Sequence, residues 1–263
     1  MTTPLCHGLV LRTAGTNCDR ETVRALELAG AAATRLHLNA LAADPARLAD
    51  SQILVLAGGF SYGDDIAAGR VLGALLRHNL FDALQRFVAD GGHVLGICNG
   101  FQVLVELGLL QPDRPAAERT IALTDNASAK FECRWVTLRQ EESAAGWLPA
   151  GRLLPVPVAH AEGRLVVRDA EALAELRERG QVALTYVAAD GSPAEYPDDP
   201  NGSDGAIAGL CDPTGRVLGL MPHPERNVTP WHHPTWTRLG PREEGEGLAF
   251  FRGLVQAASH VPV

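Results

Sequence analysis

The stretch HVLGICNGFQVLVELG, residues 93–108, places a cysteine where an expected strand meets an expected helix. HVLGIC is a short apolar run typical of a buried strand, and NGFQVLVELG reads as a helix that stops at Gly108. A side chain at such a corner projects from the carboxyl edge of a sheet, beside the free N–H groups of the helix N-terminus. The corner therefore favours a thiolate at Cys98 and predicts a sheet built of strand–helix units.

The rest of the first half repeats this alternation of short apolar strands and helices. The expected strands are GLVLRT (8–13), ATRLHL (33–38) and ILVLAGG (53–59), and the expected helices are DRETVRALELAG (19–30), DPARLAD (44–50) and LFDALQRFVADGG (80–92). We read Asp19 and Asp44 as possible N-caps of their helices. Such an alternation predicts a mainly parallel sheet covered on both faces.

The pattern changes after about residue 115, where strands follow one another without long helices between them. The expected strands are TIALT (120–124), KFECRWVTLR (130–139), RLLPVPVAH (152–160), VALTYV (182–187) and a hairpin over 206–223, and the expected helices are 169–180 and 243–258. We therefore expect one α/β domain over residues 1–263, with a mostly parallel central sheet flanked by helices and a mixed-sheet extension.

Composition excludes several classes of function. The chain has 263 residues and a net charge of −8, which disfavours nucleic-acid binding. Lys130 is its only lysine, so a phosphate-binding loop of the GK[ST] type is impossible. It has no apolar run long enough to span a membrane, and its five cysteines form no C-x-x-C pair. We expect a cytoplasmic protein with free thiols.

Three motifs carry the chemistry, and the first is G-x-C-x-G around Cys98. The flanking glycines permit a tight, strained turn like the G-x-S-x-G elbow of hydrolases, with sulfur in place of oxygen. A buried filler cysteine is an equal alternative for this motif alone. The second motif, MPHPER (221–226), follows an apolar strand and supplies a base, His223, and an orienting carboxylate, Glu225. In an extended chain these two side chains project on the same side.

The third motif is LAGGFSYGDD (56–65), where two glycines follow the end of a strand. Flexible glycine backbone there can aim N–H groups at a developing oxyanion. A phosphate cradle is the rival interpretation, but Asp64 and Asp65 would repel a phosphate. We favour an oxyanion hole.

Together these motifs resemble the class I glutamine amidotransferase family, whose fold is flavodoxin-like. A narrower resemblance is to the glutaminase subunits of phosphoribosylformylglycinamidine synthases. It is carried, in chain order, by GTNCDRE (15–21), GGFSYGDD (58–65), GICNGFQVL (96–104), FECRWVTLR (131–139), PVAHAEGR (157–164) and MPHPER (221–226). Ala14 and Ala161 depart from the proline and glycine usual in this family.

The resemblance implies a reaction. Cys98 would attack the side-chain amide of glutamine to give a thioester and ammonia, while His223 moves the protons and Glu225 orients His223. Water would then release glutamate.

The resemblance also assigns binding groups. Backbone N–H groups around Gly59, Phe60 and Asn99 would bind the oxyanion and substrate, and Gln102 would help to hold the glutamine. It implies no metal in this chain.

The resemblance further implies a division of labour between subunits. Ammonia would pass to a separate synthetase subunit that uses ATP and magnesium to convert formylglycinamide ribonucleotide to formylglycinamidine ribonucleotide in purine biosynthesis. A small bridging subunit would complete the complex, and this chain would need no cofactor of its own. Two alternatives stay open: an amidotransferase that serves another synthetase, and an α/β hydrolase-type cysteine hydrolase.

Four further features lie outside the three motifs. We expect Cys133 to be buried in mid-strand and Cys18 to open a helix, with a partner contact possible there. Two interpretations of His160 are equally supported: an ordinary surface residue, or a residue that faces the synthetase or the ammonia exit. Adjacent histidines in the late aromatic segment 227–247 lack ligand spacing, which favours a packed or partner-facing loop over a metal site.

Overall fold

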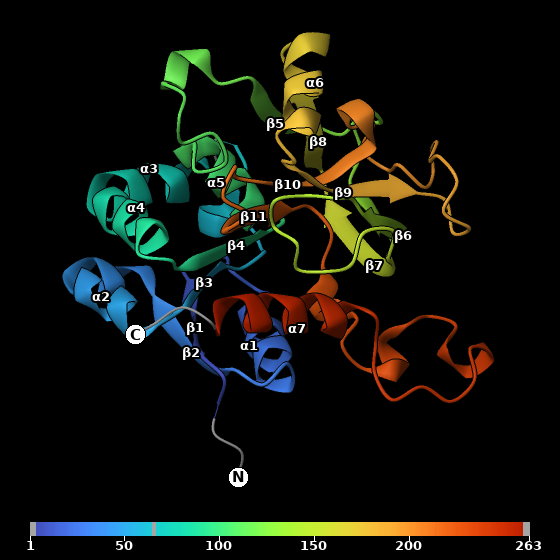
Figure 1. Ribbon diagram of the computed structural model, residues 1–263, viewed down its shortest axis with the longest axis horizontal. Helices are drawn as coiled ribbons and strands as arrows, with labels where there is room; N and C mark the ends of the chain where they lie inside the picture. Colours follow the sequence, from blue (N-terminus) through green and yellow to red (C-terminus); the bar gives the residue numbers. More distant parts are fainter. Residues whose placement is uncertain (1–3, 65–66, 260–263) are drawn as a thin grey trace.

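A mixed β-sheet runs through the molecule from β2 at one edge to β7 at the other (Figure 1). The computed structural model describes residues 4–64 and 67–259. Within them, nine strands form this sheet in the order β2-β1-β3-β4-β11-β10-β9-β6-β7. The strands are β1 (His7–Arg12), β2 (Ala32–His37), β3 (Ile53–Leu56), β4 (His93–Ile97), β6 (Glu132–Gln140), β7 (Leu153–His160), β9 (Val182–Val187), β10 (Ile207–Cys211) and β11 (Val217–Leu220).

Strands β2, β1, β3 and β4 are parallel neighbours, as the alternation in the first half predicts. Strand β11, which was expected only as an arm of the late hairpin, pairs parallel with β4. Gly96 of β4 lies between Leu56 of β3 and Gly219 of β11 in the register. The residues of β3, β4 and β11 are all buried, which is typical of a sheet covered on both faces. The carboxyl ends of β1, β3, β4 and β11 share one edge, so the segments that follow them are brought together there.

Beyond β11 the sheet becomes antiparallel, which confirms the expected mixed extension. The hairpin from β10 to β11 closes at a turn in which Gly215 N donates to Asp212 O at 3.0 Å. Strand β7 pairs with β6 so that His160 lies opposite Glu132. The N–H of His223 donates to Pro157 O at 2.9 Å, which ties β7 to the segment after β11.

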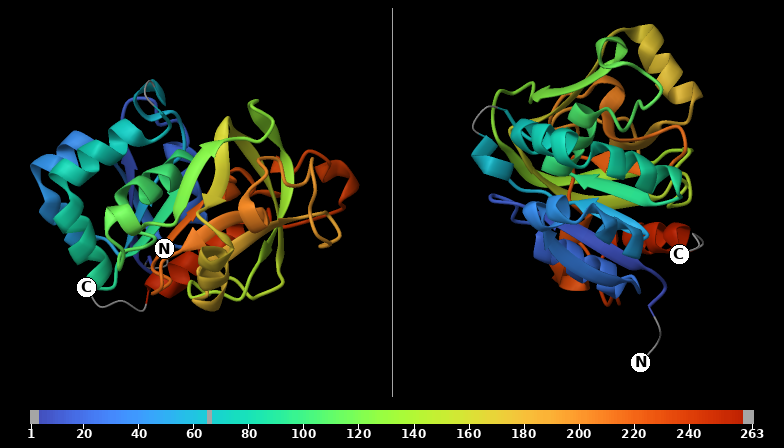
Figure 2. Two further views of the ribbon diagram at one scale, coloured as in Figure 1. Left: turned by 90° about the horizontal axis from the view of Figure 1, so that it is seen from above. Right: turned by 90° about the vertical axis from the view of Figure 1, so that its left-hand side faces the viewer.

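Helices cover both faces of the parallel half (Figures 1 and 2). Helices α1 and α7 pack together on one face, and α3 and α5 pack together on the other. The helices are α1 (Asp19–Leu28), α2 (Leu38–Ala43), α3 (Arg70–Asn79), α4 (Phe81–Ala89), α5 (Asn99–Leu107), α6 (Ala170–Glu178) and α7 (Gly247–Ala258). None of the described helices is long and apolar enough to cross a membrane.

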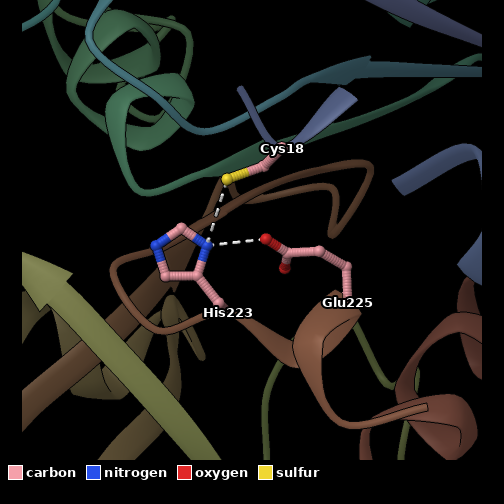
Figure 3. A group of neighbouring side chains, drawn as sticks. All are labelled: Cys18, His223 and Glu225. Carbon is pink, nitrogen blue, oxygen red and sulfur yellow. Dashed lines mark hydrogen bonds and ion pairs between the residues drawn. The ribbon is translucent and has the colours of Figure 1, made fainter. Parts of the chain in front are cut away.

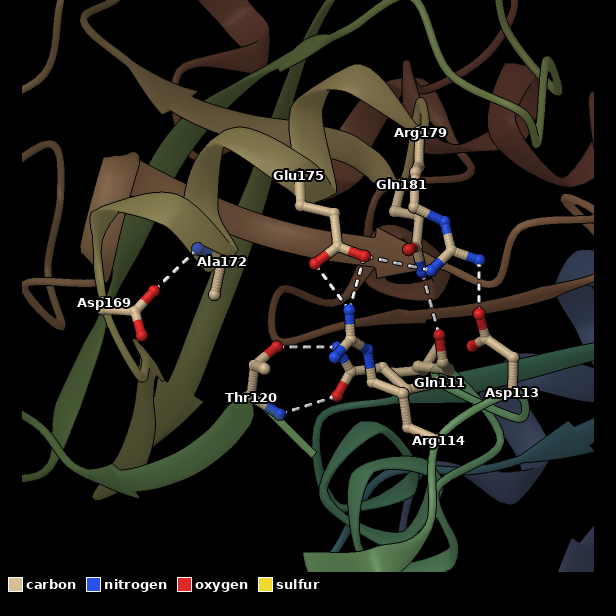
Figure 4. Close-up of polar contacts among 10 residues, drawn as sticks. Gln111, Asp113, Arg114, Thr120, Asp169, Ala172, Glu175, Arg179 and Gln181 are labelled. Carbon is tan, nitrogen blue, oxygen red and sulfur yellow. Dashed lines mark hydrogen bonds and ion pairs between the residues drawn. The ribbon is translucent and has the colours of Figure 1, made fainter. Parts of the chain in front are cut away.

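Helix α6 lies over the antiparallel half and is tied to the segment after α5 by polar contacts (Figure 4). Arg114 donates to Glu175, and Arg179 pairs with Asp113 at 2.7 Å. Deeper in the same region, the buried Gln111 side chain donates to Thr120 Oγ1 at 2.8 Å. These contacts join the two halves of the chain on the side of the sheet that carries α5.

Several expected elements differ from the structure. Helices α2 and α3 were not expected: α2 has only six residues and directly follows β2, and α3 begins directly after the glycine-containing segment that ends at Gly69. Residues Pro45–Asp50 form a 3-10 helix, and Asp44 makes no capping bond. Cys18, not Asp19, occupies the N-cap of α1. The buried Asp19 carboxylate instead forms salt bridges with Arg12 at 3.3 Å and with Arg35 at 3.1 Å.

The expected strand over 120–124 does form, but outside the main sheet. It is β5 (Ile121–Asp125), which pairs antiparallel with β8 (Glu162–Val167). Strand β8 directly follows β7 through the turn at Ala161, and no expectation covered it. The turn between β7 and β8 therefore carries the PVAHAEGR motif to the edge of the sheet where the other motifs gather.

Candidate active site

Cys98 sits at a strained corner between β4 and α5. Its φ and ψ are 52° and −108°, values that a residue with a side chain rarely adopts. A Cβ on Gly100 would come within 1.9 Å of Leu56 O, and one on Gly96 within 2.6 Å of Gly100 O. Both glycines are thus required by close backbone packing, and this packing holds Cys98 in its conformation. Strain of this kind costs about 1–3 kcal/mol and is typical of functional sites.

His223 and Glu225 form the contact that the sequence predicts, by a different backbone route. His223 Nδ1 and Glu225 Oε1 lie 2.6 Å apart, and both side chains are buried. The chain is not extended here, because Pro224–Arg226 form a 3-10 turn closed by Arg226 N donating to His223 O. The turn folds the carboxylate back onto the imidazole, and Figure 3 shows the other ring nitrogen directed away from Glu225.

The charges around His223 favour its protonated form. Burial by itself would lower the pKa of His223, but the Glu225 carboxylate and the Cys98 thiol outweigh it and raise the pKa well above the ordinary value. Cys98 and His223 also line the same cavity. With Nδ1 occupied by Glu225, Nε2 is the nitrogen left for the sulfur, which is the arrangement a nucleophile–base–orienter triad needs.

A second thiol, Cys18, lies at the same histidine and was not among the expected catalytic groups (Figure 3). Its Sγ is 3.8 Å from His223 Nδ1 and accepts from Arg226 Nη2 at 3.1 Å. Cys18 follows β1, whose carboxyl end lies on the same edge as that of β4. That position is the signal from which the sequence could have placed it here. Burial raises the pKa of the Cys18 thiol, so it is a poorer nucleophile at neutral pH.

Cys18, His223 and Glu225 also form the only group of three potential metal ligands among the described residues, with ligand atoms within 4.8 Å of one another. The Arg226 guanidinium at 3.1 Å from the sulfur opposes a second cation there. Glu225 already occupies His223 Nδ1. The cluster therefore fits the orientation of a catalytic histidine better than metal binding.

Two backbone N–H groups meet the needs of an oxyanion hole. Asn99 begins α5, so its N–H is one of the unpaired donors of a helix N-terminus. Gly59 has a φ of 143°, and no hydrogen bond joins its N–H to another described residue. The N–H of Phe60, by contrast, donates to Gly15 O at 2.9 Å, so this predicted group has its backbone donor engaged. The Phe60 ring is half-exposed and stacks on Phe131 at the cavity wall.

The predicted glutamine ligand Gln102 lines the cavity but has both ends of its amide engaged. Its Nε2 donates to Glu162 O, and its Oε1 accepts from Asn99 Nδ2 at 3.1 Å. Asn99 Nδ2 also reaches Asp64 Oδ1 at 3.3 Å, while Asp65 lies outside the described residues. In this arrangement Gln102 ties the first turn of α5 to the turn between β7 and β8.

The cavity between these groups has a volume of about 100 Å³. Cys18, Gly59, Cys98, His160, His223 and Arg226 are among the residues that line it. The end of β7 forms one wall, where Ala159 O lies 3.9 Å from Cys98 Sγ. Cys98, His223, Gly59 and the PVAHAEGR turn thus border a single space, while Glu225 lies behind the His223 ring.

Two expectations about exposure are wrong, in whole or in part. Cys133 is exposed, because it alternates with Glu132, which takes the buried position at the start of β6. His160 is buried, so the interpretation of His160 as an ordinary surface residue is wrong. In the late segment, Trp231 and Trp236 are exposed, and His233 packs against Trp135 with ring centroids 4.9 Å apart.

A strained cysteine at a strand–helix corner and a histidine held by a carboxylate border one cavity at the carboxyl edge of the sheet, together with Gly59. The profile of the family described as "CobB/CobQ-like glutamine amidotransferase domain" matches residues 6–256. The chain therefore belongs to the glutamine amidotransferases, as the sequence motifs predict.

Within that class the similarity is narrower. The chain is 44% identical over 255 residues to the phosphoribosylformylglycinamidine synthase subunit PurQ of Dehalococcoides mccartyi, covering 96% of this chain and 98% of that one. It is 40% identical to the PurQ subunit of Archaeoglobus fulgidus, covering 94% of each. A solved structure, "Structure of PurLQS from Thermotoga maritima", contains a chain with 32% identity and a TM-score of 0.70 that covers 97% of this chain and 99% of its own. The chain is a member of the PurQ family.

Proposed function

We propose that the chain hydrolyses glutamine to glutamate and ammonia, with Cys98 as nucleophile, His223 as the proton-transfer group and Glu225 as its orienter. The observation that carries the proposal is the placement of His223. Its Nδ1 is held by Glu225 at 2.6 Å, while its ring faces the cavity that it shares with Cys98. The raised pKa of His223 favours an imidazolium, which can give a proton to the departing amide nitrogen.

In the first half of the reaction, the Cys98 sulfur attacks the carbonyl carbon of the side-chain amide. The electron pair of the C=O bond moves to oxygen, where the N–H groups of Gly59 and Asn99 stabilise the negative charge. His223 then gives a proton to the amide nitrogen, the C–N bond breaks and ammonia leaves. A γ-glutamyl thioester remains on Cys98.

In the second half, His223 removes a proton from water, and the hydroxide attacks the thioester. The same N–H groups stabilise the second oxyanion, and the C–S bond breaks to release glutamate and regenerate the thiolate. Phe60 and Gln102 belong to the substrate-binding wall in this proposal: the Phe60 ring borders the cavity, and Gln102 fixes the turn between β7 and β8 against α5.

The ammonia serves phosphoribosylformylglycinamidine synthase in this proposal. The names of the relatives and the PurLQS structure support a synthetase partner, PurL, and a third subunit, PurS. The synthetase would use ATP and magnesium to make formylglycinamidine ribonucleotide, because this chain has no phosphate-binding loop. Residues 1–263 would act as one amidotransferase domain, in the cytoplasm, where the five free thiols persist.

The test uses the complex of this chain with its synthetase and PurS partners. Cys98→Ala should abolish amidine formation from glutamine and leave formation from added ammonium unchanged, because only the glutaminase step needs the thiol. Wild-type chain mixed with a guanylate synthetase subunit is the control for partner choice and should transfer no ammonia. If Cys98→Ala lost both activities while the complex still assembled, the assigned role of Cys98 would be wrong.

A further inference from the structure

His160 presents a buried nitrogen without a partner to the catalytic cavity. The residue is 3% exposed and lines the cavity together with Cys98 and His223. Its Nε2 is buried and has no hydrogen-bond partner among the described residues. Buried polar atoms in native proteins nearly always have a partner, so an orphaned one beside a reaction centre points to a ligand.

The hydrogen bonds of Asn126 determine which nitrogen of His160 carries the proton. Asn126 Oδ1 accepts from Gly163 N at 3.1 Å, while its Nδ2 donates to His160 O at 2.8 Å and to Lys130 O at 2.9 Å. These bonds fix the orientation of the amide. His160 Nδ1, 3.0 Å from Asn126 Oδ1, must therefore be the donor in that pair. In the neutral ring, Nε2 is left as a lone-pair acceptor.

The surroundings of the ring keep it in this form and position. Burial, with the nearby charge of His223, lowers the pKa of His160 to about 4, so the ring is neutral at pH 7. A Cβ on Gly163 would come within 2.4 Å of His160 Nδ1, so the glycine makes room for the ring. Asn126 and Gly163 thus fix the position of the His160 ring. Its Nε2 atom can accept a hydrogen bond and cannot donate one.

Building on the proposed glutaminase reaction, we infer that His160 Nε2 accepts a hydrogen bond from the side-chain amide nitrogen of glutamine and holds that nitrogen as it leaves as ammonia. The alternative donor on glutamine is the α-ammonium group. The scissile nitrogen is favoured because His160 lines the same cavity as Cys98 and as His223, the residue that protonates this nitrogen in the proposed reaction. The departing nitrogen would lie between the two imidazoles, one giving it a proton and the other accepting an N–H.

The same contact would discriminate between substrate and product. A glutamine amide offers an N–H to the Nε2 lone pair. A glutamate carboxylate offers only oxygen lone pairs and would be repelled. A site built to bond an N–H rejects the analogue that lacks it, because its own polar atom is then left unpaired. His160 would thus favour glutamine over glutamate and assist release of the product.

The test compares two acyl donors in the assembled complex, with glutamate release as the readout. Glutamine carries N–H at the scissile position, and the γ-methyl ester of glutamate carries none. Both carry the same α-ammonium group. For His160→Phe we expect kcat/KM with glutamine to fall by about 10- to 100-fold, as for a lost buried hydrogen bond, and kcat/KM with the ester to stay within about threefold. His160→Gln, which restores an acceptor oxygen, should recover part of the amide-to-ester ratio.

A matched control is His93→Phe. His93 is another buried histidine whose pKa is lowered to about 4 by burial, but it begins β4 at the end opposite Cys98 and packs near Trp147. Its substitution should leave the amide-to-ester ratio unchanged. If kcat/KM fell equally with glutamine and with the ester in both His160→Phe and His160→Gln, this inference would be overturned. His160 would then have a structural role or bind the α-ammonium group of the substrate. Failure of the wild-type complex to hydrolyse either substrate would instead refute the proposed glutaminase function itself.

Discussion

Gly58 packs against the imidazole of His223 so closely that a Cβ added to the glycine would lie 2.9 Å from His223 Cε1. Ile97 O and Cys18 Sγ, each at 3.3 Å, close the other sides of the same space. Gly58→Ala should therefore push the imidazole out of line with Cys98. We expect kcat/KM for glutamine to fall about 100-fold, since small displacements of catalytic groups have effects of this size. Steady-state kinetics of the complex measure it.

The control for this substitution is Gly8→Ala. A Cβ on Gly8 would also meet an atom at 2.9 Å, but that atom is the end of the flexible Leu26 side chain, far from the triad in the register of the sheet. Gly8→Ala should cost some stability and no activity. Equal activity in the two variants would show that His223 tolerates displacement.

Cys98 and Cys18 line one cavity, and only Cys98 should react with a glutamine-like diazo ketone. Cys98 lies at the N-terminus of α5, whereas burial raises the pKa of Cys18 and keeps it a thiol. Peptide mass spectrometry should find the label on Cys98 in the wild type and in Cys18→Ala, and no label in the cavity in Cys98→Ala. Label on Cys18 in the wild type would contradict the assignment of the nucleophile.

The backbone strain at Cys98 predicts that its glycine variant is more stable than its alanine variant, the reverse of the usual order. Glycine normally costs about 0.5–1 kcal/mol relative to alanine in a regular element. At Cys98 the φ of 52° reverses the preference, because alanine keeps a strained backbone that glycine relaxes. We expect Cys98→Gly to be about 1 kcal/mol more stable to urea than Cys98→Ala.

The comparison position for this order is Cys211, which is buried in β10 without a positive φ. There Cys211→Gly should be the less stable variant by a similar amount. The same order at both positions would mean that the corner at Cys98 stores no strain.

Most of the parallel half of the fold could be predicted because β1, β3 and β4 are short apolar runs with glycines in or beside them. The three motifs of the site share one edge because they follow β3, β4 and β11, which are neighbouring parallel strands. Helix α3 was missed because its buried residues, Leu72, Gly73 and Leu76, make too short a stripe to stand out beside the glycine-rich segment before it. Strand β8 was missed because its partner β5 lies about 40 residues earlier in the chain, a pairing that no local pattern reports.

Within the site, the sequence motifs predicted which residues take part better than they predicted how those residues contact one another. The His223–Glu225 pair was expected from an extended chain, yet the 3-10 turn after Pro224 makes it. The place of Cys18 after β1 indicates this edge of the sheet, but its contact with His223 depends on the turn after β11, which no local pattern reports. The burial of His160 depends on the register of β7 against β6. The alternation along β6 was assigned the wrong face, because Cys133 was expected to be buried and Glu132 takes the buried position.

Stability between pH 5 and pH 7 should report the neutral state of His160. Its pKa is about 4 in the folded chain and 6.5 in the reference state, so in this window the unfolded chain binds the proton and the folded chain does not. The free energy of unfolding therefore falls as pH falls from 7 to 5, by about 2 kcal/mol for this one group. His160→Phe removes the group, so its stability should fall less than that of the wild type over the same range. Urea titrations at the two pH values measure the difference. Identical pH dependence in the two proteins would mean that the His160 ring takes up a proton as readily when folded as when unfolded.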